Sequence, residues 1–143
     1  MTKKHKSILL IEDNDAELTM IALKKIDLHN QVIHLKDGAE AVDFFEQEKY
    51  RDQLELTRIK CVFLDLKLPK LSGFQVLEKL RGNSILNSLP IIVLSSSGVE
   101  SDIQRAYDLG ANSYIIKPIN FTEHSKAIRD AALYWTEVNK TID

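Results

Sequence analysis

Short apolar runs alternate along this chain with longer segments that have helical spacing. The runs are rich in Ile, Val and Leu, and they are continuous rather than alternating with polar residues. Such runs are typical of strands that are buried on both faces of a parallel sheet. The pattern predicts five strands, at Ile8–Ile11, Val32–Leu35, Cys61–Leu64, Ile91–Leu94 and Tyr114–Ile116.

A helix is predicted after each strand. In the first helix, Asn14 and Glu17 have the spacing of a capping box, and one face carries Leu18, Ile21, Ala22 and Ile26. The second helix is expected over about residues 39–47, and the last begins near Asn120 with Glu123 as its capping partner. The apolar faces of the later helices carry Phe74, Leu77 and Leu80, then Ile103, Ala106 and Tyr107, and finally Phe121, Ser125, Ile128, Ala132 and Trp135.

Five strand–helix units of this kind predict an α/β fold, a doubly wound parallel sheet with helices on both faces. The flavodoxin-like strand order 2-1-3-4-5 is the common solution. The 143 residues suit one domain, 1–143, with its core at about 7–139 and no output domain. The connection Glu48–Ile59 is longer than usual, and we expect it to extend the second helix and then form an exposed loop.

Composition excludes several classes of protein. Nineteen basic residues against twenty-one acidic ones give a net charge of -2, which favours neither nucleic acid nor a membrane surface as a partner. The single cysteine, Cys61, cannot form an internal disulfide and lies in an apolar run, as expected for a buried thiol in a reducing cytoplasm. No apolar stretch is long enough to span a bilayer.

Polar residues follow four of the predicted strands. Glu12 and Asp13 follow the first, Asp65 the third, Ser95 the fourth and Lys117 the fifth. In an open parallel sheet these strand ends share one edge, where ligands bind. Each residue alone could be a helix cap or a turn residue. When three carboxylates are brought together, either one of them stays protonated or a cation neutralises them. Mg²⁺ suits such oxygen ligands, and the remaining groups suit phosphoryl transfer to a carboxylate nucleophile.

The same residues carry a resemblance to the receiver domain of two-component response regulators, in its stand-alone form. The motifs are Leu10-Ile11-Glu12-Asp13-Asn14, Leu64-Asp65-Leu66-Lys67-Leu68-Pro69 with Gly73, Ile91-Ile92-Val93-Leu94-Ser95-Ser96, and Gly110-Ala111 before Tyr114-Ile115-Ile116-Lys117-Pro118. The resemblance covers about residues 7–139.

That resemblance implies a role for each matching position. Asp65 is the expected phosphoacceptor, and Mg²⁺, or another divalent cation, is expected to bind with Glu12, Asp13, Asp65 and the backbone carbonyl of Lys67. Ser95 and Lys117 are expected to bind the phosphoryl group. Tyr114 is expected to rotate on activation, and the Lys117–Pro118 bond is expected to be cis.

The resemblance also implies how the protein signals. A sensor histidine kinase would supply the phosphoryl group, and the long 48–59 connection with Tyr134-Trp135 resembles small receivers that pair with phytochrome-type kinases. The expected protein is a signalling phosphoacceptor rather than an enzyme, although it would assist its own phosphorylation and dephosphorylation. Its output would pass by protein contact, through the surface of the fourth helix, fifth strand and fifth helix, and homodimerisation is one expected form of that contact. The candidate contact residues are Tyr107, Tyr114, Ile128 and Trp135, of which Tyr107, Ile128 and Trp135 could instead be core residues.

Three alternatives remain beside this interpretation. An aspartyl-phosphate phosphatase of the haloacid-dehalogenase type would need an acid two residues after Asp65, where Lys67 stands. A flavodoxin would need a phosphate-binding loop after the first strand, where Glu12 and Asp13 stand. A pseudo-receiver that binds partners without phosphorylation would keep the fold and lack the chemistry.

Overall fold

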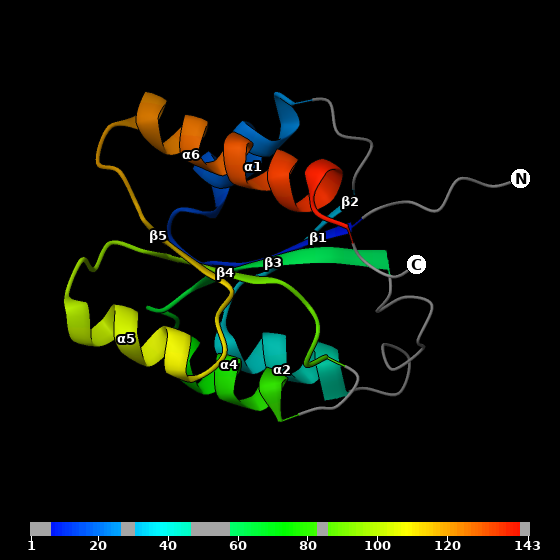
Figure 1. Cartoon of the computed structure of the whole chain (residues 1–143), viewed down its shortest axis with the longest axis vertical. Coiled ribbons are helices and arrows are strands. Elements are labelled where there is room, and N and C mark those ends of the chain that lie inside the picture. The colour runs from blue at the N-terminus through cyan, green and yellow to red at the C-terminus, as the bar shows by residue number, and fades with distance from the viewer. Residues whose placement is uncertain (1–6, 27–30, 47–57, 83–85, 141–143) are drawn as a thin grey trace, which may run out of the picture.

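A five-stranded parallel sheet runs through the middle of the computed structural model (Figure 1). The structure describes residues 7–26, 31–46, 58–82 and 86–140. The strands are β1 (Ser7–Ile11), β2 (Gln31–Leu35), β3 (Ile59–Asp65), β4 (Ile91–Ser95) and β5 (Ser113–Ile116). Their order, β2-β1-β3-β4-β5, confirms the predicted flavodoxin-like topology.

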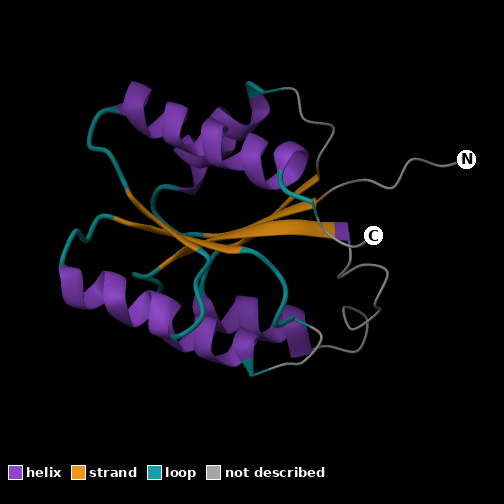
Figure 2. Ribbon diagram, viewed as in Figure 1, coloured by secondary structure: helices purple, strands orange, loops and turns teal. Residues whose placement is uncertain are grey.

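Helices cover both faces of this sheet. They are α1 (Ala16–Lys24), α2 (Gly38–Glu46), α4 (Gly73–Arg81), α5 (Glu100–Asp108) and α6 (Phe121–Leu133), which continues into the π-helical turn η2 (Tyr134–Val138). Figure 2 shows α1 and α6 on one side of the strands and α2, α4 and α5 on the other. Most of the predicted 48–59 connection lies outside the described residues, and its last residue, Ile59, already belongs to β3.

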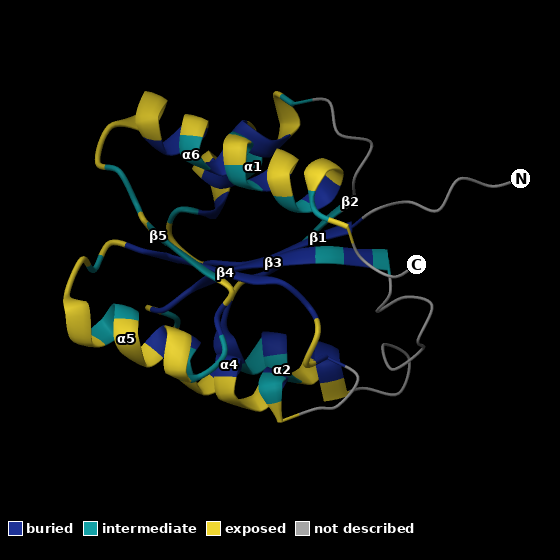
Figure 3. Cartoon of the chain, in the orientation of Figure 1, coloured by how far each residue is buried: buried dark blue, intermediate teal, exposed yellow. Residues whose placement is uncertain are grey.

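The strands are continuously apolar because each face of the sheet has its own core. Successive side chains of a strand point to opposite faces. In β1, Leu9 and Ile11 pack toward α2, α4 and α5, whereas Ile8 and Leu10 pack toward α1 and α6. Figure 3 shows the central strands buried and the outer surfaces of the helices exposed.

The first helix differs from its prediction in two respects. Its N-cap is Asp15 rather than Asn14, and no side chain caps it, because the Asp15 carboxylate is bound to Lys117 instead. The buried residues are Ala16, Thr19, Ala22 and Leu23, while Leu18 and Ile21 are exposed. The helix therefore buries two alanines, a threonine and Leu23, and leaves two large apolar residues, Leu18 and Ile21, at the surface.

The start of α4 lies against the end of β3. Ser72 and Gln75 form a reciprocal capping box, which the sequence analysis did not predict. Gly73 follows the cap, and its amide donates to the carbonyl of Leu66 at 2.9 Å. A side chain at Gly73 would overlap the backbone carbonyl oxygen of Asp65. Only glycine lets this helix approach the strand end so closely.

Candidate phosphoacceptor site

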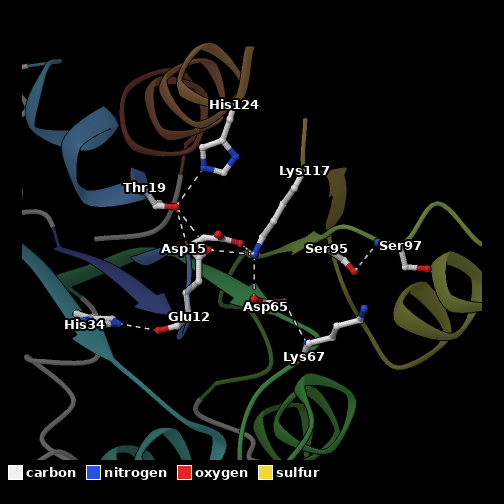
Figure 4. Close-up of polar contacts among 10 residues, drawn as sticks. All are labelled: Glu12, Asp15, Thr19, His34, Asp65, Lys67, Ser95, Ser97, Lys117 and His124. Atoms are coloured by element: carbon white, nitrogen blue, oxygen red, sulfur yellow. Dashed lines mark hydrogen bonds and ion pairs between the residues drawn. The ribbon is translucent and has the colours of Figure 1, made fainter. Parts of the chain in front are cut away.

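The parallel register brings the predicted site residues to one edge of the sheet. Ile11 pairs with Leu64, so that Glu12 and Asp65 follow side by side on neighbouring strands. The amide of Lys117 donates to the carbonyl of Ser95 at 2.7 Å, which aligns the ends of β4 and β5. Glu12, Asp65, Ser95 and Lys117 thus meet as predicted, although they are far apart in the sequence (Figure 4).

Lys117 is the centre of the cluster. Its ammonium nitrogen lies 2.9 Å from Oδ2 of Asp65, 2.9 Å from Oδ2 of Asp15 and 3.5 Å from Oε2 of Glu12. The Glu12 side chain is fully buried, and those of Lys117 and Asp65 are about nine-tenths buried. One cation therefore faces three carboxylates at a largely dry edge of the sheet.

Burial and charge act in opposite directions on these groups. Burial raises the pKa of Glu12 overall, and a hydrogen bond from Thr19 and the charge of Lys117 offset only part of this rise. For Lys117, burial would lower the pKa, but the nearby carboxylates, Glu12 first, raise it overall. Lys117 is therefore fully charged at neutral pH, and its charge is committed to the carboxylates.

Ser95 is turned toward the loop that follows its own strand. Its hydroxyl accepts a hydrogen bond from the amide of Ser97 at 3.1 Å, and Figure 4 shows it directed away from Asp65. The hydroxyl of Tyr114 donates to the carbonyl of Ser97 at 2.9 Å. The Ser97 hydroxyl in turn donates to Asp102 in the first turn of α5 at 2.6 Å. Ser95 must rotate before it can donate to a group on Asp65.

Two predicted metal ligands, Asp13 and Lys67, make no side-chain contact with Lys117 in the cluster described above. Asp13 is exposed just after Glu12, and the amide of Lys67 donates to Oδ1 of Asp65 at 3.0 Å. Within the described residues, no three His, Cys, Asp or Glu side chains are arranged to hold a metal ion. Mg²⁺, however, usually binds through one or two carboxylates and several waters. Glu12, Asp13, Asp65 and the carbonyl of Lys67 offer oxygen donors of this kind, and the surplus of carboxylates over Lys117 favours a cation.

Sequence reasoning missed three residues of this cluster. Asp15 binds Lys117 directly, and Thr19 donates to Oε1 of Glu12 at 2.6 Å. His124 of α6 contacts Thr19 through its Nε2 atom at 3.3 Å. Asp15 and Thr19 lie four residues apart, which is the spacing of one helical face. In the sequence, this spacing is the one sign that both residues could face the site.

One further expectation is wrong. The Lys117–Pro118 bond is trans, since the described residues contain no cis peptide bond. Of the residues that could be either contact residues or core, Ile128 is core, because it lies on the buried face of α6. Trp135 is half buried against the same core, whereas Tyr107 is exposed on α5.

The family follows from a match over most of the chain. Residues 8–129 match the response regulator receiver domain. The chain therefore belongs to this family of two-component signalling proteins, which pair with histidine kinases.

Relatives of similar size share both sequence and fold. The chain is 33% identical over 135 residues to the response regulator Rcp1 of Synechocystis, covering 92% of this chain and 90% of that one. It is 34% identical over 136 residues to a probable methanogenesis regulatory protein, FilR2, of Methanothrix harundinacea, covering 94% and 86%. The phosphorylated cyanobacterial phytochrome response regulator RcpA superposes with a TM-score of 0.85 at 34% identity, covering 95% and 97%.

A structure of the Mn²⁺-bound form of Rcp1 superposes equally well, with a TM-score of 0.85 at 32% identity, covering 96% of this chain and 99% of that one. A divalent cation is thus found with a protein of this fold and family. Across the described ranges of the present chain, none of the helices is both long and apolar enough to cross a membrane.

Proposed function

We propose that this chain is a single-domain response regulator that accepts a phosphoryl group on Asp65 from a histidine kinase, with a divalent cation at the same site. The observation that carries the proposal is the position of Lys117. Its ammonium lies 2.9 Å from the Asp65 carboxylate. A cation at this distance can neutralise one oxygen of the acceptor before transfer and bind a phosphoryl oxygen afterwards.

The transfer itself needs few groups. A carboxylate oxygen of Asp65 attacks the phosphorus of a phosphohistidine, and a P–O bond forms as the P–N bond breaks. The electron pair of the broken bond stays with the imidazole nitrogen. Glu12, Asp13, Asp65 and the carbonyl of Lys67 would hold Mg²⁺, whose charge would offset that of the carboxylates and of the phosphoryl oxygens.

Ser95 and Tyr114 would carry the change outward. A phosphoryl group on Asp65 offers the Ser95 hydroxyl a charged acceptor for its proton, and this hydrogen bond is stronger than the one that the hydroxyl now accepts from the Ser97 amide. Turning toward the phosphoryl group breaks the bond from Ser97 to Ser95. Because Tyr114 is bound to the same loop at the Ser97 carbonyl, a rearrangement there reaches β5 and the surface of α5. This biases an equilibrium between two arrangements of the loop.

The output is proposed to be a protein contact. Apolar side chains are exposed on and near α5 and β5, at Val99, Tyr107, Ile116 and Ile119. Grouped exposed apolar residues are typical of interaction surfaces. A second copy of the chain or a downstream protein would bind there in response to phosphorylation.

The kinase is proposed to be of the phytochrome type. The support is the likeness to RcpA, a phytochrome response regulator, at 34% identity over nearly the whole chain. Comparing phosphotransfer rates from a purified phytochrome-type kinase and from an unrelated histidine kinase tests this choice. Equal or slower transfer from the phytochrome-type kinase would contradict it.

The acceptor is tested with a small donor. Wild type, Asp65→Asn and Asp37→Asn are incubated with acetyl phosphate, with and without Mg²⁺, and the acyl phosphate is measured by intact mass and by its lability to hydroxylamine. Asp37 is the matched control, since it is a buried aspartate that caps α2 after another strand. We expect Mg²⁺-dependent label in wild type and Asp37→Asn and none in Asp65→Asn. Label that survives in Asp65→Asn would refute the acceptor, and an unlabelled wild type would favour a pseudo-receiver.

A further inference from the structure

Two buried polar residues, one from each helix, contact each other in the seam between α1 and α6. Thr19 of α1 is fully buried, and His124 of α6 is 5% exposed. Their neighbours in this core include Ala22, Leu23 and Ile128. Polar groups in such surroundings are costly unless they are hydrogen-bonded. Their partners therefore indicate why they are there.

The hydrogen bonds in the seam have a fixed direction. A carboxylate only accepts, so the 2.6 Å contact between Thr19 and Glu12 uses the single hydroxyl proton of Thr19. Thr19 can then only accept from His124, whose Nε2 lies 3.3 Å from its oxygen. His124 thus carries a proton on Nε2 and donates to Thr19, and Thr19 donates to Glu12 (Figure 4).

This pair of bonds fixes the orientation of the Glu12 carboxylate. Oε1 is held toward α1 by Thr19, which leaves Oε2 at 3.5 Å from the ammonium of Lys117. The backbone of Glu12 is also held, because His34 donates to its carbonyl at 2.7 Å and its own amide donates to Leu35 at 3.1 Å. Among these contacts, the hydrogen bond from Thr19 is the shortest one to the Glu12 side chain.

We propose that Thr19 and His124 are positioning residues for the acidic pocket: they orient Glu12, so that the pocket can bind its divalent cation and Asp65 can be phosphorylated. The inference rests on the proposed function and deepens it. It gives a role at the site to a residue of α6, a helix that packs against α1 and the core of the same face. Partners of this kind beyond the direct ligands of a metal change its affinity by roughly 10- to 100-fold when they are removed.

A purely structural role makes a different prediction. Removing a buried hydroxyl or imidazole would then lower the free energy of unfolding and leave cation affinity unchanged. Thr136 provides the matched comparison: it is also buried, in η2, and its hydroxyl donates to the carbonyl of Ala132 at 2.6 Å. Thr136→Val removes the same group without touching the Glu12 contacts, so we expect it to affect stability only.

The experiment compares Thr19→Val, Thr19→Ser, His124→Leu, His124→Gln and the double variant Thr19→Val with His124→Leu. Affinity for Mg²⁺ and Mn²⁺ is measured by titration calorimetry, labelling by acetyl phosphate, and stability by urea unfolding. Thr19→Val should weaken cation binding about tenfold, and Thr19→Ser should restore it. His124→Leu should weaken binding in wild type but not further in Thr19→Val, because His124 acts through Thr19; His124→Gln, which keeps an N–H donor, should be milder than Leu.

The outcomes separate this inference from the proposed function. Unchanged cation affinity in Thr19→Val and His124→Leu, in a protein that binds the cation and is labelled on Asp65, overturns the positioning role alone. A wild type that binds no cation overturns both. If Thr19→Val does not fold, His124→Leu decides, since it leaves the Thr19 hydroxyl in place: an affinity equal to that of wild type refutes the role.

Discussion

The ammonium of Lys117 lies as close to Asp15 as to Asp65, at 2.9 Å from an Oδ2 atom of each. Asp15 is half exposed at the start of α1, and none of the predicted site motifs gave it a role. Asp15 therefore competes with Asp65 for the ammonium of Lys117, which is proposed to bind the phosphoryl group.

We expect Asp15→Asn to accelerate labelling of Asp65 by acetyl phosphate. The change releases Lys117 from one partner and removes a negative charge that repels an anionic donor. Partly exposed ion pairs are worth about 0.2–1 kcal/mol, so the increase should be at most roughly fivefold. Asp130→Asn is the control, because Asp130 also pairs with a lysine, Lys126 at 2.7 Å, but on the outside of α6. Slower labelling in Asp15→Asn would show instead that Asp15 assists the reaction.

Gly73→Ala should displace the backbone of Asp65 and so disturb the site. The new methyl group would overlap the carbonyl oxygen of Asp65, and a backbone atom cannot move aside cheaply. We expect a loss of roughly 1–3 kcal/mol in the free energy of unfolding, together with slower labelling. In Gly82→Ala the nearest atoms lie at 3.5 Å and the backbone is helical, so a neutral or slightly stabilising effect is expected. Urea unfolding of both variants measures the difference, and equal effects would contradict the close approach.

Tyr114→Phe should weaken the link between β5 and the loop that carries Ser95. The lost bond from its hydroxyl to the carbonyl of Ser97 should lower the free energy of unfolding by about 1 kcal/mol. The same substitution at Tyr107, which is exposed, should have no measurable effect. A shift of the Ser97 amide resonance in Tyr114→Phe would place the change in the loop, and an unchanged resonance and stability would show that the bond is not formed in solution.

The sheet could be predicted in detail because a strand buried on both faces leaves a direct mark on the sequence. All five apolar runs are strands, extended by a residue or two at some ends. The buried face of α1 could not be predicted in the same way. Helical spacing shows which residues are neighbours on the helix, but it does not show which side another helix covers. Close packing against α6 buries Thr19 and Ala22, and leaves Leu18 and Ile21 exposed.

The candidate site likewise contains residues that could be predicted from the sequence and residues that could not. Residues that directly follow strands, such as Asp65 and Lys117, could be placed because parallel strands end at one edge. Asp15, Thr19 and His124 reach the cluster from helices, and their contacts depend on how α1 and α6 are seated. No motif could identify them. The roles of Asp13 and Lys67 in binding a metal ion stay predictions, which rest on the preference of Mg²⁺ for oxygen donors.

Cys61 gives a prediction for pH and thiol chemistry. Burial raises the pKa of its thiol from 9.0 to about 12. The unfolded chain therefore loses this proton at lower pH than the folded one, so the thiol's contribution to stability is complete below about pH 9 and falls as pH rises further. Between those two pKa values the free energy of unfolding should fall by about 1.4 kcal/mol per pH unit on this account.

Urea unfolding of wild type and Cys61→Ala near pH 8 and pH 10 measures this fall, because the other titrating groups are common to both proteins. Wild type should lose more stability over the interval than Cys61→Ala, by roughly 1 kcal/mol. An aromatic disulfide reagent should leave the native thiol unmodified and react at once after denaturation, since only an accessible thiolate attacks it. Parallel pH dependences, or rapid reaction of the folded protein, would show that Cys61 is not shielded by β3 and the core beneath α6.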